Sequence, residues 1–127
     1  MREMAFNCEI RVEEVEGLRY LEVKLISGDI TGHPEGSYQG LEKKIREQSE
    51  GEGLPVVIDA REYEGYIDST AIGAFGLLGR EKDLTFIIAP NKPLIGLLRV
   101  VSSGTGADGL KIVNTQKEAL GYIEKPR

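Results

Sequence analysis

Apolar and polar residues alternate along two neighbouring segments near the start of the chain, residues 6–12 and residues 19–25. A period of two is typical of a strand that buries one face, and the Glu16-Gly17 pair between the segments suits a tight turn. The pattern therefore predicts a β-hairpin. Its inward-facing positions are Phe6, Cys8, Ile10, Val12, Leu21, Val23 and Leu25.

The spacing of the apolar residues changes after a loop at residues 27–36. Tyr38, Leu41 and Ile45 recur at helical intervals, and charged residues fill the remaining positions. This pattern predicts an amphipathic helix with one face toward solvent. We expect the helix to break at residues 49–53.

Three short apolar runs follow, at residues 56–58, 84–89 and 110–113. Continuous runs without alternation are typical of strands covered on both faces. Segments with helical spacing, residues 69–78 and 93–101, lie between these runs. Strand–helix–strand order implies right-handed crossovers, so we expect a parallel sheet.

The last predicted element is a helix that begins with a capping box, Thr115 followed by Glu118. Ala119, Leu120 and Ile123 would face inward. The elements together predict an α/β fold of about five strands and four helices. We expect one domain over residues 1–127, because two domains of half this length would each lack an ordinary core.

Composition and charge remove several classes of function. The 127-residue chain contains one cysteine, Cys8, and one histidine, His33, too few for an internal disulfide or a Cys/His zinc site. The net charge is −5, and all of this excess lies in residues 1–55. An acidic chain is a poor candidate for binding nucleic acid, because the phosphate backbone is also negative. Without a membrane-spanning run or signal-peptide core, we expect a cytoplasmic protein with no membrane partner.

The glycine-rich run at residues 104–109 matches the letters of a dinucleotide-binding fingerprint. That fingerprint works after a strand and before a helix, where the helix N-terminus holds the pyrophosphate. Here the predicted order is helix, glycines, strand, so a helix C-cap and a turn are favoured. We therefore expect no cofactor. Cys8 is expected in the core, and His33 in an exposed loop.

Asp68 and Ser69 end a loop immediately before an apolar helix, and either could be its N-cap. A phosphate on Ser69 would lie where free backbone N–H groups and the positive end of the helix dipole point. The helix also carries Gly73 and Gly76, which lower helix propensity. Close approach by another surface could account for them, as could packing against the chain's own sheet. In the second case Ser69 is only a cap.

The chain resembles a STAS domain (sulfate transporter and anti-sigma factor antagonist). The specific part is Ile67-Asp68-Ser69-Thr70-Ala71-Ile72-Gly73, and Val56–Asp59, Leu84–Ile88 and Lys117–Leu120 agree with it. The resemblance implies a mixed, mostly parallel sheet with helices packed largely on one side. It also implies a stand-alone anti-sigma factor antagonist, not an enzyme, with Ser69 as phosphosite and Thr70 as second choice.

The implied activity is partner switching. The unmodified protein would bind an anti-sigma factor that is also a serine kinase, and would thereby free a sigma factor. Phosphorylation of Ser69 would dissociate the complex, and a phosphatase would reset it. The partner surface implied by the resemblance and by position comprises Asp29, Thr31, His33, Asp68, Ser69, Thr70 and Gly73.

This sequence departs from the family pattern at three places. Ala71 stands where the family often has glycine, and Thr31 stands where it usually has an acidic residue, with Asp29 two residues earlier. The stretch at residues 32–36 that follows is also distinctive, and residues 79–83 form a short link where the family often has a longer helix. Two other functions stay open: a STAS scaffold or sensory module in a larger signalling assembly, and a nucleotide- or lipid-binding domain.

Overall fold

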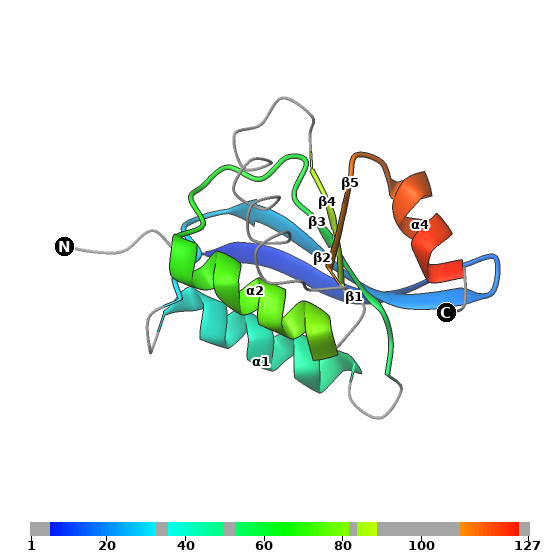
Figure 1. Ribbon diagram of the computed structural model, residues 1–127, viewed down its shortest axis with the longest axis horizontal. Helices are drawn as coiled ribbons and strands as arrows, with labels where there is room; N and C mark the ends of the chain where they lie inside the picture. The colour runs from blue at the N-terminus through cyan, green and yellow to red at the C-terminus, as the bar shows by residue number, and fades with distance from the viewer. Residues whose placement is uncertain (1–5, 33–35, 50–52, 82–83, 89–109, 125–127) are drawn as a thin grey trace.

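The computed structural model describes residues 6–32, 36–49, 53–81, 84–88 and 110–124, and the structural statements below concern these residues. The helix expected at residues 93–101 and the glycine run at 104–109 lie outside them. The elements in chain order are β1 (Asn7–Val15), β2 (Leu18–Ser27), α1 (Ser37–Ser49), β3 (Val56–Asp59), α2 (Ser69–Glu81), β4 (Leu84–Ile87), β5 (Leu110–Val113) and α4 (Gln116–Glu124) (Figure 1).

The five strands form one mixed sheet in the order β1-β2-β3-β4-β5. β1 and β2 are antiparallel, and the pairs β2–β3, β3–β4 and β4–β5 are parallel. Glu16 and Gly17 have φ values of 53° and 86°. Positive φ at both positions is what a two-residue type I′ hairpin turn requires. The predicted hairpin and mostly parallel sheet are therefore confirmed.

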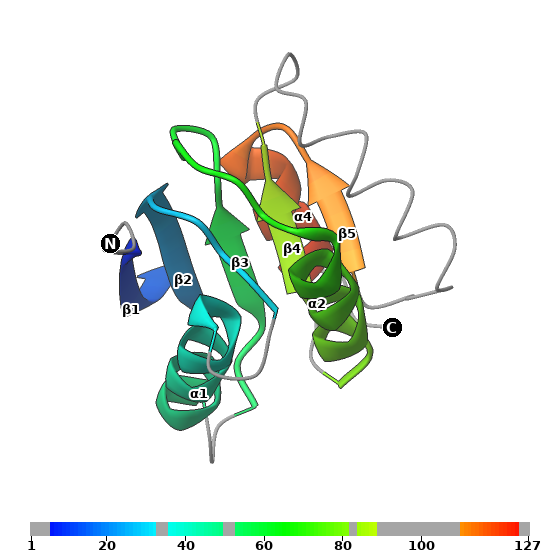
Figure 2. The same cartoon turned by 90° about the vertical axis from the view of Figure 1, so that its left-hand side faces the viewer.

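The described helices divide between the two faces of the sheet, with α1 and α2 on one face and α4 on the other (Figure 2). On the first face Phe75 of α2 makes edge-on ring contacts with Tyr38 of α1 and Phe86 of β4, at centroid distances of 4.9 and 5.0 Å. Edge-to-face geometry is favourable for aromatic pairs. These contacts fix α2 against α1 and the sheet.

The smaller core lies between the sheet and α4. Ala119 is fully buried there, and Leu120 and Ile123 pack against the same cluster, as predicted. The capping box is also confirmed, because the Glu118 amide donates to Thr115 Oγ1 at 3.1 Å and the Thr115 amide donates to Glu118 Oε1 at 3.2 Å. These two bonds satisfy amides that a helix start otherwise leaves without partners.

Several boundaries differ from the predictions. β1 extends to Val15 and β2 starts at Leu18, so both strands reach the turn. The pairing between them continues to Val15 and Leu18 although Glu13 and Glu14 interrupt the alternation. The predicted link at residues 79–83 is wrong over its first three residues, since α2 continues to Glu81. Gly79 is buried, so packing overrides its low helix propensity. Among the described residues, no helix is both long and apolar enough to cross a bilayer.

Candidate functional site

Two segments that are distant in sequence run side by side at one end of the sheet: residues 27–32, which begin with the last residue of β2, and residues 63–68, which precede α2. We call them the paired loops. Their backbones form a short parallel ladder, in which the Gly28 amide donates to the Glu64 carbonyl at 3.1 Å and the Ile30 amide to the Tyr66 carbonyl at 2.9 Å. The Asp68 amide returns a bond to the Ile30 carbonyl at 3.1 Å. This ladder fixes the loop that leads into α2.

Asp68 is the N-cap of α2. Its Oδ1 accepts from the Ala71 amide at 2.8 Å and from the Gly32 amide at 3.1 Å, so one carboxylate joins the helix start to the opposite loop. Ser69 is the first residue of the helix. Of the two N-cap residues that the sequence allowed, Asp68 has the role.

Asp29 and Thr31 hold the other loop in place. Asp29 Oδ1 accepts from the Tyr66 amide at 3.2 Å, and the Asp29 carbonyl accepts from Ser37 Oγ at 2.7 Å. The Thr31 amide donates to Ser37 Oγ at 3.0 Å, and its carbonyl accepts from the Tyr38 amide at 3.0 Å. The loop is therefore tied to both α1 and the paired loop.

The fold thus brings together most of the predicted partner surface. Asp29, Thr31, Asp68 and Thr70 lie on or beside the paired loops, with the backbone of Ser69 among them, and Gly73 follows one helical turn later. His33 lies outside the described residues. A β-carbon at Gly73 would meet no atom of the described residues within 4 Å. Packing against the described strands of the sheet therefore does not account for this glycine.

Two residues of the site, Tyr63 and Gly65, had no signal in a local reading of the sequence, and Gly32 had one only as the start of the distinctive stretch at residues 32–36. A β-carbon at Gly32 would lie 2.6 Å from the Ala71 nitrogen, and one at Gly65 would lie 2.6 Å from the Tyr63 hydroxyl. The Tyr63 hydroxyl is buried and donates to the Gly28 carbonyl at 2.5 Å. Burial, and secondarily the charge of Asp29, raises the pKa of Tyr63 well above its ordinary value. Close loop packing therefore requires glycine at positions 32 and 65.

We expect Tyr63→Phe to lower the free energy of unfolding by about 1–2 kcal/mol, because the buried Gly28 carbonyl loses its hydroxyl donor. Tyr63 of the unfolded chain ionises above its ordinary pKa of 10.0, whereas the raised pKa keeps Tyr63 of the folded chain protonated. The contribution of Tyr63 to stability is therefore fully present below pH 10.0, and it is lost as the pH rises through the folded pKa. Urea unfolding between pH 8 and about pH 11 measures both effects.

Tyr63→Phe should flatten the alkaline loss of stability without abolishing it, because burial also raises the pKa of Tyr20. Tyr122→Phe is the matched control, since Tyr122 is 51% exposed on α4. If the free energy of unfolding fell equally steeply with pH in the wild type and in Tyr63→Phe, the raised pKa of Tyr63 would be contradicted.

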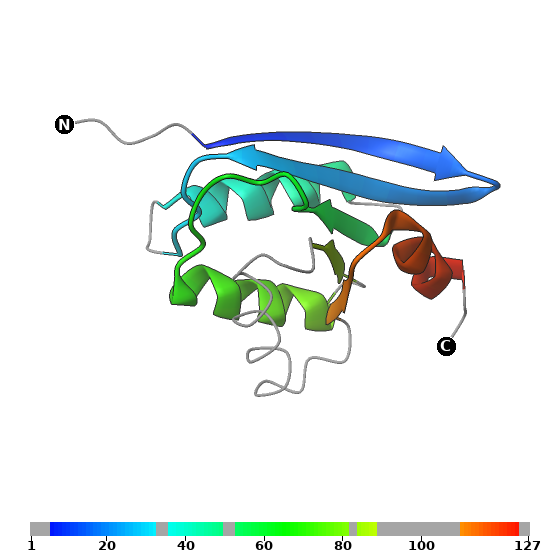
Figure 3. The ribbon, with the colours of Figure 1, turned by 90° about the horizontal axis from the view of Figure 1, so that it is seen from above.

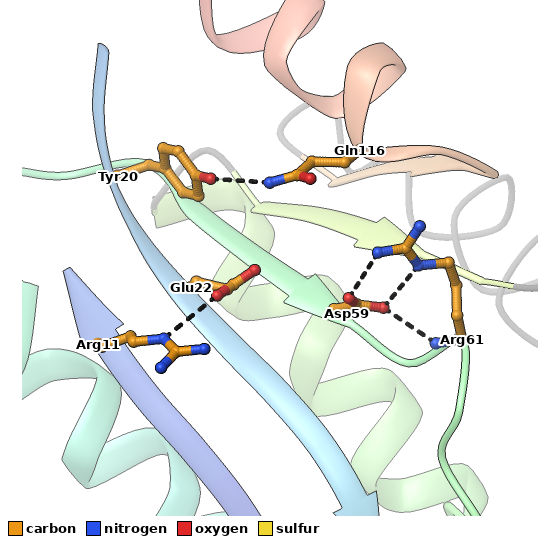
Figure 4. Close-up of polar contacts among 6 residues, drawn as sticks. All are labelled: Arg11, Tyr20, Glu22, Asp59, Arg61 and Gln116. Carbon is orange, nitrogen blue, oxygen red and sulfur yellow. Dashed lines mark hydrogen bonds and ion pairs between the residues drawn. The ribbon is translucent and has the colours of Figure 1, made fainter. Parts of the chain in front are cut away.

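Asp59 is engaged by a neighbouring arginine. It lies on the sheet face opposite α1 and α2, where its two oxygens accept from Arg61 at 3.0 and 2.8 Å (Figure 4). Burial works to raise the pKa of Asp59, but the Arg61 hydrogen bonds outweigh it and hold the pKa below its ordinary value. Within the described ranges, no cluster of His, Cys, Asp and Glu could hold a metal ion.

Cys8 is half-buried rather than fully enclosed, and it packs against the larger core cluster. Burial raises the pKa of its thiol, with the opposing effect of Lys44 smaller. A thiol in this state is a weak nucleophile. The expected packing role of Cys8 is thus confirmed only in part, because one side of the residue meets solvent.

Comparison with known proteins identifies the fold. No family model matches the chain, and no curated protein matches it. Among solved structures, it is similar to an uncharacterized protein of the DUF3478 family with a SpoIIAA-like fold, from Shewanella loihica PV-4. The two share 18% sequence identity with a TM-score of 0.65, over 97% of this chain and 98% of the other. This likeness shows the fold, so the predicted fold class, a mixed and mostly parallel sheet with packed helices, is confirmed as a SpoIIAA-like fold.

Proposed function

We propose that this protein is an anti-sigma factor antagonist that works by phosphorylation-controlled partner switching. The observation that carries the proposal is the place of Ser69, the first residue of α2, directly after the Asp68 cap and beside the loop of Asp29 and Thr31. The SpoIIAA-like fold of the similar structure supports it. The partner is an anti-sigma factor that is also a serine kinase, and a phosphatase reverses the modification.

The surface around Ser69 has the chemistry of a protein interface. Thr70, Gly73 and Leu77 follow at intervals that place them on one side of α2. Leu77 is 60% exposed, and so is Tyr66 on the adjacent loop. Exposed aromatic and aliphatic side chains are typical anchors for a protein partner. The open space at Gly73 allows the partner's backbone to approach closely.

In this proposal the chain is a substrate and a ligand, not an enzyme. The kinase partner binds ATP, and the Ser69 oxygen takes the γ-phosphoryl group. The bond from that group to the β-phosphate breaks, ADP leaves, and the serine proton passes to a base of the kinase. The product carries about −1.5 to −2 charges at a position packed against the partner. Burying that charge without a cationic group is unfavourable, so the complex dissociates.

A tagged pull-down from the native host tests the function with wild type, Ser69→Ala and Ser69→Asp. We expect the first two to retain a protein with a kinase domain and Ser69→Asp to lose it. If all three capture the same large assembly, the scaffold function is favoured. If none captures a protein, a thermal-shift screen with nucleotides and lipids tests the ligand-binding alternative.

Gly73→Ala should have opposite effects on stability and on binding. Alanine at an open helical position stabilises the fold by about 1 kcal/mol relative to glycine. The same methyl group would obstruct a partner backbone, so we expect about tenfold weaker binding of the captured protein, equivalent to about 1.4 kcal/mol. Urea unfolding and titration calorimetry measure the two effects.

Gly121→Ala is the matched control, because Gly121 lies within α4 and its β-carbon would also meet no atom within 4 Å. It should increase stability without changing affinity. If Gly73→Ala binds as tightly as Gly121→Ala, the partner does not contact this side of α2.

A further inference from the structure

β1 is an edge strand. Within the described part of the chain it pairs only with β2, and in Figure 3 it lies along the outer margin of the sheet. It is nine residues long, so one side of its backbone presents a long row of hydrogen-bonding groups. A long edge strand is a template for pairing with another strand unless side chains prevent it.

The side chains of β1 are complementary to a second copy of the same strand. In an antiparallel pair centred on Ile10, Ile10 lies opposite its own copy, Cys8 opposite Val12, and Glu9 opposite Arg11. Val12 is 39% exposed, so pairing would cover an exposed apolar side chain. Each Glu9–Arg11 contact joins opposite charges, and symmetry supplies two of each contact.

The apolar pairs favour this register over the one centred on Val12. In that register Ile10 would lie opposite Glu14 and Glu9 opposite Val15, although Arg11 would face Glu13. If one strand were shifted by one residue, its core-facing side chains would lie opposite the solvent-facing side chains of the other strand. Across residues 8–12, the Ile10-centred register places every apolar residue opposite an apolar one and each charged residue opposite one of the other sign, which the Val12-centred register does not.

A hollow at the same edge provides room for the second copy. It has a volume of about 310 Å³ and lies between β1 and α1, lined by Phe6, Cys8, Gly40 and Lys44 among others. In the Ile10-centred register, Val12 of the second copy lies opposite Cys8, at the wall of this hollow. Glu14 of the second copy lies opposite Phe6, on the side where Lys44 offers a positive charge.

We propose that two copies of this chain associate through antiparallel pairing of their β1 strands, in the register centred on Ile10. The two sheets then form one continuous sheet across the dimer axis. A single strand and a shallow hollow bury less than the roughly 1,200 Å² of a stable interface. The dimer therefore forms only at high protein concentration.

A charge-exchange series tests the pairing by sedimentation equilibrium, at concentrations up to about 1 mM. Glu9→Arg and Arg11→Glu each replace two attractive contacts by two repulsive ones, so each should weaken association about tenfold or more. The double variant restores opposite charges and should return to within about threefold of the wild type. Lys43→Glu with Glu47→Lys, on the exposed side of α1, is the control and should change nothing.

The register is tested by disulfide formation under mild oxidation. In Cys8→Ser/Ile10→Cys the two new cysteines lie opposite each other, about 4.5–5.5 Å apart at Cα, which a disulfide spans. In Cys8→Ser/Val12→Cys they are offset by four residues, or about 13 Å. We expect the first variant to cross-link and the second not to. A wild type that stays monomeric at about 1 mM, or faster cross-linking of the second variant, overturns the proposal.

Discussion

Gly32→Ala is expected to lower the free energy of unfolding by about 2–3 kcal/mol, the largest loss of stability that we predict for a single methyl group. The added β-carbon would lie 2.6 Å from the Ala71 nitrogen and 2.7 Å from the Thr70 carbonyl carbon. Both are backbone atoms at the start of α2, so neither can move without displacing the helix. The shift would also separate the Gly32 amide from Asp68.

Gly40→Ala provides the matched control for that substitution. Gly40 lies inside α1, and a β-carbon there would meet no atom within 4 Å. Alanine should therefore stabilise the fold by up to about 1 kcal/mol. Urea unfolding gives both values, provided that the slope of unfolding free energy with urea is unchanged. Equal stabilities for the two variants would contradict the close packing of the paired loops.

The elements with regular patterns could be predicted from the sequence. β5 has the predicted limits, Leu110–Val113, and the Glu16-Gly17 turn lies where the two alternating segments meet. Period and turn chemistry are local properties, so a single sequence contains them. Strand ends were predicted less well, because the β1–β2 ladder continues past the residues that interrupt the alternation.

The candidate site was predicted only in its local part. The run from Asp68 to Gly73 has a recognisable pattern, but the bond from the Gly32 amide to Asp68 joins residues 36 positions apart. No local spacing indicates such a contact. Gly32 falls within the predicted loop at residues 27–36 and no pattern singles out Gly65, whereas the structure requires both glycines because another backbone or side chain lies against each one. Close approach between distant segments is a tertiary property.

The position of Ser69 leads to the second large prediction, that phosphorylation leaves the fold intact while it abolishes binding. A dianion at the first residue of α2 lies near the positive end of the helix dipole, so we expect the free energy of unfolding to change by less than about 1 kcal/mol. The same charge in a packed interface should weaken binding of the captured partner by about a hundredfold or more, or about 2.8 kcal/mol.

Ser69→Asp reproduces part of this charge, and Thr115→Asp is its control. Thr115 caps α4, which covers the opposite face of the sheet, and aspartate also serves well as an N-cap. Both variants add one negative charge at the start of a helix, so the change in net charge is matched. Titration calorimetry should show a large loss of affinity for Ser69→Asp and wild-type affinity for Thr115→Asp. An equal loss of affinity in both variants would indicate that net charge governs binding. Unchanged affinity in both would show that the partner does not bind at the start of α2.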